Sequence, residues 1–498
     1  MSASFGVYFD IESGSAGVRD PPAIYHKDGF PAPSPLELDE MAWGAKYNGL
    51  PTPTQSGTQT PCSETPRAIN EFTISRPPTP RREEAAGLVQ SWNNPPQNRW
   101  RVLACCLIYF GNGMSDSGPG ALIPYMQEDY NIKYAVVSLI FVTQAVGFII
   151  AAFFTDALLN KLGRSKALML AEILLIIGNV MIVCTPPFPV IVVAFAFIGY
   201  ATAINLALNN VFCSILANAA VVLGIAHGAY GIGGIAGPII ATALVSHGIV
   251  WSRYYLFTLG IRILCFFFAG WAFWGHEREA PIRLLNALEQ KASRQAVESG
   301  DPGKRQLLAQ ALKNRVTLMG ALSTFAYQGA EVSISGWVIS FLINYRHGDP
   351  AQVGYVTAGF WGGITVGRFT LSHLSHRIGE MKFLYGLGIG AIAFQILVWQ
   401  VPNVIGDAVA VGIIGLLLGP VAPCSTVIFV RLLPRRLQTT GVSFISSAGS
   451  SGGAVVPLLT GLLAQVSGTW VLHPICIGCF VLMLLCWIAL PSVEKRDE

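Results

Sequence analysis

Apolar runs long enough to cross a lipid bilayer follow one another along most of this 498-residue chain. A membrane-spanning helix needs about 20 predominantly apolar residues. We expect twelve such segments, at residues 101–122, 134–157, 167–184, 188–212, 221–246, 254–274, 315–343, 351–372, 382–400, 404–430, 439–464 and 470–490. Only helices and closed barrels span lipid, and these runs lack the alternation of barrel strands. The sequence therefore predicts an all-α polytopic membrane protein.

The composition agrees with a chain that sits in lipid. Apolar residues make up 52% of the sequence and charged residues only 12%, about half the usual share of a soluble domain. So few charges cannot cover a soluble surface of this size. The formal net charge of +4 is small, and no dense basic block occurs, which argues against nucleic-acid binding.

Polar stretches divide the chain into five regions. The expected regions are an N-terminal tail at 1–98, a six-helix bundle at 99–275, a central loop at 276–314, a second six-helix bundle at 315–490 and a C-terminal tail at 491–498. The first tail is rich in Pro, Ser, Thr and Gly, so we predict that it is disordered. Its Thr-Pro pairs suit proline-directed kinases as partners, although disordered composition alone also explains them. These pairs are Thr52-Pro53, Thr60-Pro61, Thr65-Pro66 and Thr79-Pro80.

Lysine and arginine are distributed unequally between the loops. The odd-numbered loops contain only Lys133, Arg253 and Arg346, whereas the central loop alone carries seven basic residues, and Arg315 follows it directly. Positive residues favour the cytoplasmic side of a membrane. We therefore expect both termini in the cytoplasm, with the protein in the plasma membrane or in a vacuolar or other endomembrane.

The two halves of the chain repeat one another. Gly163 and Gly379 lie 216 residues apart, each in the loop that follows the second helix of its half. Pro238 and Pro457 lie 219 residues apart. The acidic residues Asp116 and Glu331, each in the first helix of its half, are separated by 215 residues. One nearly constant offset indicates an internal duplication.

Two motifs then resemble a known family. The loop Asp156…Gly163-Arg164-x-Lys166 and the run Gly233-Gly234-x-x-Gly237-Pro238 are similar to the signatures of the major facilitator superfamily. Asn112-x-x-x-Asp116, His227-Gly228 and Gly329-Ala-Glu331 resemble a fungal branch near the fucose permeases and glucose symporters, although Asn209 and Asn210 stand where that group has an acidic residue. The resemblance implies two pseudo-symmetric six-helix halves around a central cavity lined by helices one, four, seven and ten.

Asp116 and Glu331 are the candidate proton-coupling residues. A charged side chain within the hydrocarbon region costs roughly 2.5–3.5 kcal/mol, so it is usually functional. A carboxyl group in a low dielectric can bind and release a proton near neutral pH. A fixed ion pair or a helix contact is the alternative. Arg262 is expected either to neutralise one of these acids or to pair within its own half.

Polar and aromatic residues on the expected cavity helices are candidates for solute binding. Amides and hydroxyls on one helix face can bond a hydroxylated solute, and a tryptophan can stack on a sugar or a drug-like ring. Such residues also hold helices together in lipid, which is the alternative for each of them. The candidate substrate-binding residues are Asn112, Asn205, Asn209, Gln328, Trp337 and Trp361.

A third group of residues is expected to control the change between conformations. Asp156, Arg164 and Lys166 would form a cytoplasmic charge latch, with Arg368 and Arg377 as its counterpart in the second half and Gly163 at the turn. Gly237 and Pro238 would serve helix packing and rocking. An ordinary positively charged loop is the alternative for the basic residues.

These residues together favour a secondary active transporter that works by alternating access, and the paired acids favour coupling to protons. The chain has no Walker-type ATP-binding motif, no HExxH motif and no metal-ligand spacing, so we expect no enzyme, metal or cofactor. The partners are a small-molecule solute, protons and the bilayer. A sugar, another polar metabolite, a drug-like compound or an organic anion all fit, as do symport, antiport and uniport. A transporter-like sensor that signals through its tail is the alternative.

Overall fold

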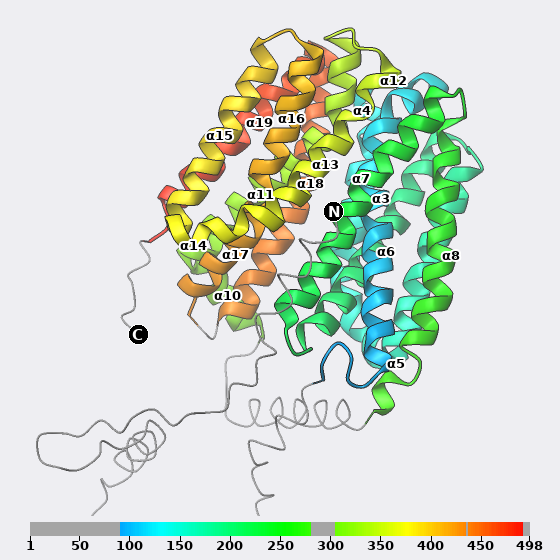
Figure 1. Cartoon of the computed structure of the whole chain (residues 1–498), viewed down its shortest axis with the longest axis vertical. Coiled ribbons are helices and arrows are strands. Elements are labelled where there is room, and N and C mark those ends of the chain that lie inside the picture. Colours follow the sequence, from blue (N-terminus) through cyan, green and yellow to red (C-terminus); the bar gives the residue numbers. More distant parts are fainter. Residues whose placement is uncertain (1–89, 280–303, 435–436, 492–498) are drawn as a thin grey trace, which may run out of the picture. The chain divides into compact units, whose positions relative to one another are not determined.

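Helices form every regular element in the residues that the computed structural model describes, namely 90–279, 304–434 and 437–491 (Figure 1). This confirms the predicted all-α class. The Thr-Pro pairs of the first tail, most of the central loop and nearly all of the C-terminal tail lie outside these residues.

The helices pack in two sets, which Figure 1 shows in blue to green and in yellow-green to red. The first set comprises α3 (Gln97–Tyr130), α4 (Tyr134–Val137), α5 (Leu139–Val183), α6 (Phe188–Ser214), α7 (Ala219–Ser246) and α8 (Tyr254–Ala272). The second set comprises α10 (Lys304–Lys313), α11 (Arg315–Asn344), α12 (Pro350–Val353), α13 (Val356–Thr370), α14 (Ser375–Ile378), α15 (Glu380–Gln400), α16 (Val404–Leu418), α17 (Val421–Leu432), α18 (Gln438–Ser467) and α19 (Leu472–Ile488).

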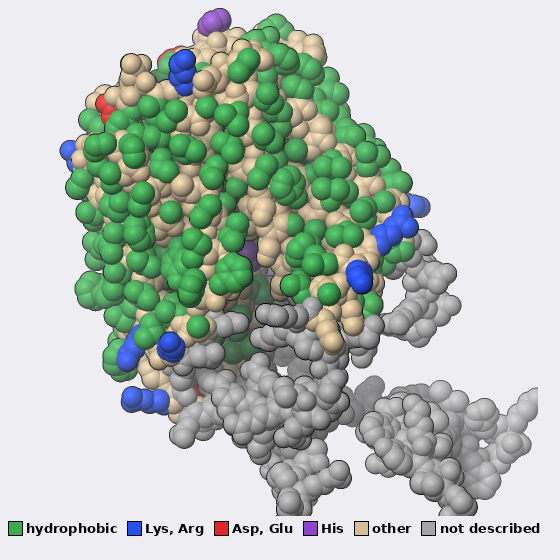
Figure 2. All heavy atoms as spheres, turned by 180° about the vertical axis from the view of Figure 1, so that it is seen from behind, with side chains coloured by type: hydrophobic (Ala, Val, Ile, Leu, Met, Phe, Trp, Pro, Cys, Tyr) green, Lys and Arg blue, Asp and Glu red, His purple; other side chains and the backbone are tan. Residues whose placement is uncertain are grey.

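Nine helical segments in the described part of the chain are long and apolar enough to cross a membrane. Figure 2 shows the hydrophobic side chains that cover the sides of the molecule, with most Lys and Arg near its two ends. Helices α3, α11 and α13 are not among the nine, and they carry Asp116, Glu331 and Arg368. The total of twelve membrane helices therefore stays a prediction.

The repeated glycines Gly163 and Gly379 share an unusual backbone conformation. Gly163 interrupts α5 with φ 76° and ψ 168°, and Gly379 precedes α15 with φ 96° and ψ 124°. Side chains disfavour positive φ, so glycine is the residue that makes each turn without strain. Two predicted segments, 134–157 and 167–184, thus follow each other almost continuously through Gly163.

Gly163→Ala is expected to lower stability by about 1–3 kcal/mol, because alanine is strained at this φ and ψ. The measurement is the thermal unfolding midpoint of the purified protein in detergent. Gly260→Ala is the matched control: Gly260 lies inside α8 with no atom within 4 Å of an added Cβ. The control should be neutral or slightly stabilising, and equal melting temperatures for both variants would contradict the argument.

Glycines allow close contact between α3 and α7 in the first set and between α11 and α18 in the second set. A Cβ at Gly233 of α7 would overlap the carbonyl oxygen of Phe110 in α3, and one at Gly452 of α18 would overlap that of Phe325 in α11. The α3–α7 and α11–α18 pairs are therefore equivalent in the two sets. Gly237 lies against Ser117 of α3, which suits a packing role.

The two sets touch at the end that carries α4 and α12. The backbone N–H of Ala135 donates to Gln465 Oε1 at 3.2 Å, and the Tyr134 and Trp337 rings meet edge to face with centroids 5.7 Å apart. Toward the other end of the molecule, Figure 2 shows a hollow between the two sets. The described conformation is therefore closed at the α4 and α12 end.

A polar cluster holds the start of α3 at the other end. The Arg101 guanidinium donates to both carboxylate oxygens of Glu279 and, through Nε, to the carbonyl of Ala272 at 3.0 Å. Asn98 donates to the carbonyl of Ser91 at 2.9 Å. Burial, with the positive charges of Arg101 and Arg164, lowers the pKa of His276 to about 3, so this histidine is neutral.

Helix α3 begins at Gln97, before the predicted start at 101.

Candidate functional site

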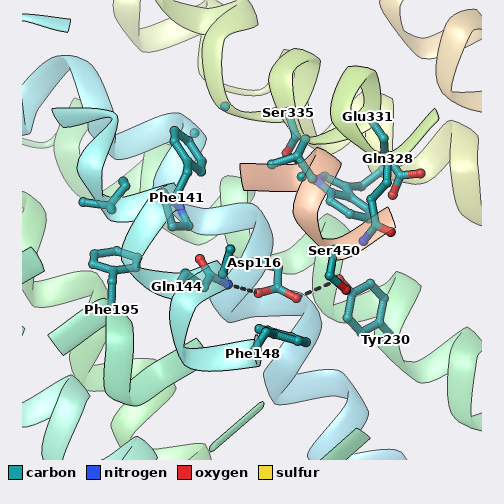
Figure 3. Close-up of a pocket in the computed structure, with 18 residues that line it drawn as sticks. Asp116, Phe141, Gln144, Phe148, Phe195, Tyr230, Gln328, Glu331, Ser335 and Ser450 are labelled. Atoms are coloured by element: carbon teal, nitrogen blue, oxygen red, sulfur yellow. Dashed lines mark hydrogen bonds between the residues drawn. The ribbon is translucent and has the colours of Figure 1, made fainter. Parts of the chain in front are cut away.

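Asp116 is held by two donors from different helices. Its Oδ1 accepts from Gln144 Nε2 of α5 at 2.9 Å, and its Oδ2 accepts from the Tyr230 hydroxyl of α7 at 2.8 Å (Figure 3). A carboxylate that accepts at both oxygens is suited to its ionised form, which has no proton to donate. These two donors hold the carboxyl group at one position on α3.

Glu331 of α11 faces the same cavity from the second set. The cavity has a volume of about 130 Å³, and Figure 3 shows Asp116 and Gln144 on one side, with Gln328, Glu331 and Ser335 on the other. Glu331 is 7% exposed, and its Oε2 has no hydrogen-bond partner among the described residues. A buried carboxylate oxygen without a protein partner can accept a hydrogen bond from a solute or bind a proton.

Aromatic rings complete the cavity wall. Phe141 and Phe148 of α5, Phe195 of α6 and Trp361 of α13 line it. The Trp361 indole donates to Ser335 Oγ at 2.9 Å and meets the edge of Tyr230 with ring centroids 5.9 Å apart. These bonds fix the indole between the two sets.

Arg368 lies near Glu331. It is close enough to Tyr327, Glu331 and Tyr230 to interact with them electrostatically. The Tyr327 hydroxyl and Arg368 Nε are both buried without a hydrogen-bond partner within the described part of the chain. Arg368, proposed from the sequence as a gate residue, is therefore positioned beside the cavity.

The structure places the candidate substrate-binding residues in several different surroundings. Gln328 and Trp361 line the cavity with Asp116 and Glu331, whereas Asn112, Asn205, Asn209 and Trp337 do not. Asn205 donates to Glu172 at 2.7 Å, and Asn209 accepts from the Cys105 thiol at 3.4 Å. Trp337 donates to the carbonyl of Pro457 at 3.0 Å and so joins α11 to α18.

Asn112 and the remaining gate candidates also lie in different surroundings. Both amide atoms of Asn112 are buried without a hydrogen-bond partner among the described residues. Arg164 is buried against α6, where it donates to the carbonyl of Leu208 and lies over the Phe212 ring. Lys166 and Arg377 are exposed, Pro238 lies inside α7, and the Asp156 side chain is outside those that the structure describes. The latch stays a prediction.

Three residues of this region were not predicted from the sequence. Gln144 and Tyr230 bind Asp116, but a single amide in an apolar run and a tyrosine in a glycine-rich run are weak signals. Glu172 is different, because it is an acidic residue inside the run 167–184 and the reasoning used for Asp116 would have identified it. Arg262 pairs with Glu172, within the same half of the chain.

Three comparisons identify the family. The model of the Major Facilitator Superfamily matches residues 105–457, and an overlapping match covers residues 322–498. "Bypass of stop codon protein 6" from Saccharomyces cerevisiae is 27% identical over 82% of this chain and 86% of its own length. The glucose/mannose transporter GlcP of Bacillus subtilis is 23% identical over 71% of this chain and 85% of its own length.

Solved structures show the same fold. The nucleoside transporter NupG, solved as a point mutant, superimposes with a TM-score of 0.63 at 13% identity, over 78% of this chain and 99% of that one. A D-xylose-proton symporter gives a TM-score of 0.63 at 13% identity, over 79% and 98% of the two chains. The family match, the apolar helices and this fold together show that the chain is an integral multi-pass membrane protein that belongs to the Major Facilitator Superfamily.

Proposed function

We propose that this protein is a proton-coupled secondary transporter of a neutral hydroxylated solute, such as a sugar. The observation that carries the proposal is that Asp116 and Glu331, one from each set of helices, face a single cavity between the sets. A solute or proton bound there contacts both sets at once. Its binding therefore favours one arrangement of the sets over another, which is the requirement of alternating access.

The charges at the cavity support coupling to a proton. With Asp116, Glu331 and Glu172 ionised and Arg262 and Arg368 cationic, this cluster of five groups has one excess negative charge. An uncompensated buried charge is costly, and one bound proton would remove the excess. Protonation of Asp116 Oδ2 would give this oxygen a proton of its own, so that it could donate to the Tyr230 hydroxyl instead of accepting from it. The Tyr230 hydroxyl would then be free to donate elsewhere.

The lining supports a hydroxylated solute. A hydroxyl group both donates and accepts, so it can bond the carboxylate of Glu331 and the amide of Gln328 at once. The excess negative charge would repel an anion, and once a proton has removed that excess, a cationic solute would bring a new uncompensated charge into the site. Trp361 and Phe141 offer apolar surfaces to the C–H faces of a ring. The glucose, mannose and xylose named for the relatives are solutes of this class.

The orientation of the chain also remains part of the proposal. We propose that the end with α4 and α12 faces outward and that both termini are cytoplasmic, because basic loops favour the cytoplasm. Because Cys184 is exposed, it is first replaced by serine. In that background a cysteine at Lys291 should be unreactive toward an impermeant maleimide in intact cells and reactive after permeabilisation. Labelling in intact cells would contradict this topology.

Reconstitution in liposomes tests the function directly. Proteoliposomes with an imposed inward proton gradient would be offered labelled glucose, mannose, galactose, xylose and, as charged comparisons, gluconate and glucosamine. The proposal expects uphill uptake of a neutral sugar that a protonophore abolishes. Uptake restricted to a charged solute would overturn the solute class, and gradient-independent equilibration would overturn proton coupling.

Tyr230→Phe is expected to slow proton-driven uptake about tenfold while leaving solute binding largely intact. The variant keeps the ring against Trp361 but removes a hydrogen bond to a charged group, which contributes about 1.5–3 kcal/mol. Initial uptake rates and binding by calorimetry measure the two effects separately. Tyr385→Phe on α15, where the ring packs on Trp487, is the control. Equal rates in both variants would show that the Tyr230 hydroxyl is not needed.

A further inference from the structure

A second charge pair is buried within the first set of helices, outside the cavity lining. Glu172 of α5 and Arg262 of α8 are fully buried, and Arg262 Nη1 lies 3.8 Å from Glu172 Oε1. A buried pair offsets its desolvation only with close contact and further hydrogen bonds. Here Glu172 Oε2 and Arg262 Nε have no hydrogen-bond partner among the described residues. So costly an arrangement suggests a role beyond stability.

The pair is connected to Asp116 through α3. Arg262 Nη2 donates to Ser115 Oγ at 3.0 Å, and Ser115 directly precedes Asp116. A Cβ at Gly111 would lie 3.1 Å from Arg262 Nη1, so the guanidinium rests on the backbone of α3. Arg262 interacts electrostatically with both Asp116 and Glu172. One cation is therefore shared by two carboxylates.

The remaining neighbours of the two carboxylates are uncharged or lie on the cavity side. Asp116 faces Gln144 of α5, Tyr230 of α7 and Tyr254 of α8, with Glu331 of α11 across the cavity and Arg368 of α13 beside Tyr230. Glu172 faces Asn205 of α6, which donates to it at 2.7 Å, and Cys265 of α8. Among the described side chains of the first set, Arg262 is the charged group that acts on Asp116.

We propose that Glu172 is a positioning residue that, through Arg262, sets the pH at which Asp116 binds its proton. A nearby cation favours the ionised carboxylate, and the negative charge of Glu172 partly cancels the effect of Arg262. Glu172, which accepts from Asn205, also lies 3.8 Å from the guanidinium. This inference rests on the proposed function, because it assigns the proton to Asp116.

Infrared difference spectroscopy of the full chain in detergent measures the pH midpoint of Asp116 protonation, and it needs no solute. Protonated carboxyl groups absorb apart from ionised ones, and Asp116→Asn identifies the component that belongs to Asp116. In Glu172→Gln the full charge of Arg262 acts on Asp116. The midpoint for Asp116 should then move to lower pH by about one unit, a tenfold loss of proton affinity. Arg262→Gln should move it in the opposite direction, to higher pH.

A matched control separates this electrostatic role from a purely structural one. Thr258 of α8 donates to Asn179 of α5 at 2.5 Å, which joins the same two helices without any charge. Thr258→Val should lower the melting temperature and leave the midpoint of Asp116 unchanged. Glu172→Asp retains the charge and should keep the midpoint close to that of the parent protein, so it tests the inference even if Glu172→Gln does not fold.

The outcomes distinguish this inference from the proposed function. An unchanged or higher midpoint in Glu172→Gln, or a full one-unit shift in Glu172→Asp, would overturn the role of Glu172. If Asp116→Asn removes no titrating carboxyl component, Asp116 is not the proton site, and the proposed coupling fails instead. A component lost in Asp116→Asn that moves in opposite directions in Glu172→Gln and Arg262→Gln would establish the inference.

Discussion

Glu331→Gln should abolish uphill solute accumulation, so that the internal concentration never exceeds the external one. Glutamine has nearly the size of glutamate and can form hydrogen bonds, but it cannot take up or release a proton. Exchange of labelled for unlabelled solute should persist, because exchange need not carry a proton across the membrane. Proteoliposomes with and without an imposed proton gradient measure both activities on one preparation.

The alternative for Glu331 is that it only holds helices together. In that case Glu331→Gln would lower the melting temperature and leave the pH profile of uptake unchanged. Asp116→Asn should resemble Glu331→Gln in uptake, since both acids line the cavity. Glu380→Gln is the control, because Glu380 pairs with Arg431 at 2.9 Å at the start of α15, outside the cavity lining. Full uphill uptake by Glu331→Gln would end the coupling hypothesis.

Gly120→Ala should open the end of the molecule that carries α4 and α12. A Cβ at Gly120 of α3 would overlap the carbonyl oxygen of Ser335 in α11, so the two sets must separate there. Overpacking of this kind costs about 1–3 kcal/mol, and each 1.4 kcal/mol changes an equilibrium about tenfold. Because the contact exists only where the sets meet, the cost acts on the closed state rather than on the fold of either set.

Spin labels at Lys133 and Val466 measure this opening, because both residues line the groove at that end of the molecule. Gly120→Ala should shift the distance distribution toward longer separations than in the parent protein. Gly359→Ala is the control, since nothing lies within 4 Å of a Cβ added at Gly359 of α13. A distribution unchanged by Gly120→Ala would mean that the helices adjust locally, without a change between states.

The fold class followed from patterns that act within single helices. A run of apolar residues in lipid favours a helix wherever it occurs, because a helix forms the hydrogen bonds of the backbone N–H and C=O groups within one segment. The repeat of Gly163 and Gly379 was visible from spacing alone, and both residues have positive φ. The ends of helices were harder to predict: α3 begins at Gln97 and α5 continues through the turn at Gly163.

The candidate site was predictable only in part. Asp116 and Glu331 were identified because an acid in an apolar run is expensive wherever it points. Gln328, which the sequence offered as a solute-binding residue, lines the cavity with Glu331. Asn205 and Asn209 were candidates of the same kind, because polar residues on one face of a helix can bond a solute, but their side chains bond Glu172 and Cys105 inside the first set. A period defines a face of a helix without saying what covers that face.

By itself, the sequence determined the all-α membrane fold, the internal repeat and the two acids at depth, since each depends on local composition or on spacing along the chain. The tertiary structure alone decided which side chains meet. It brought Tyr230 and Gln144 to Asp116, Arg368 to Glu331, and Arg262 to a place between Glu172 and Asp116. These partners lie on different helices, and the bond between Asp116 and Tyr230 joins residues 114 positions apart, so only the packing of helices in three dimensions selects them.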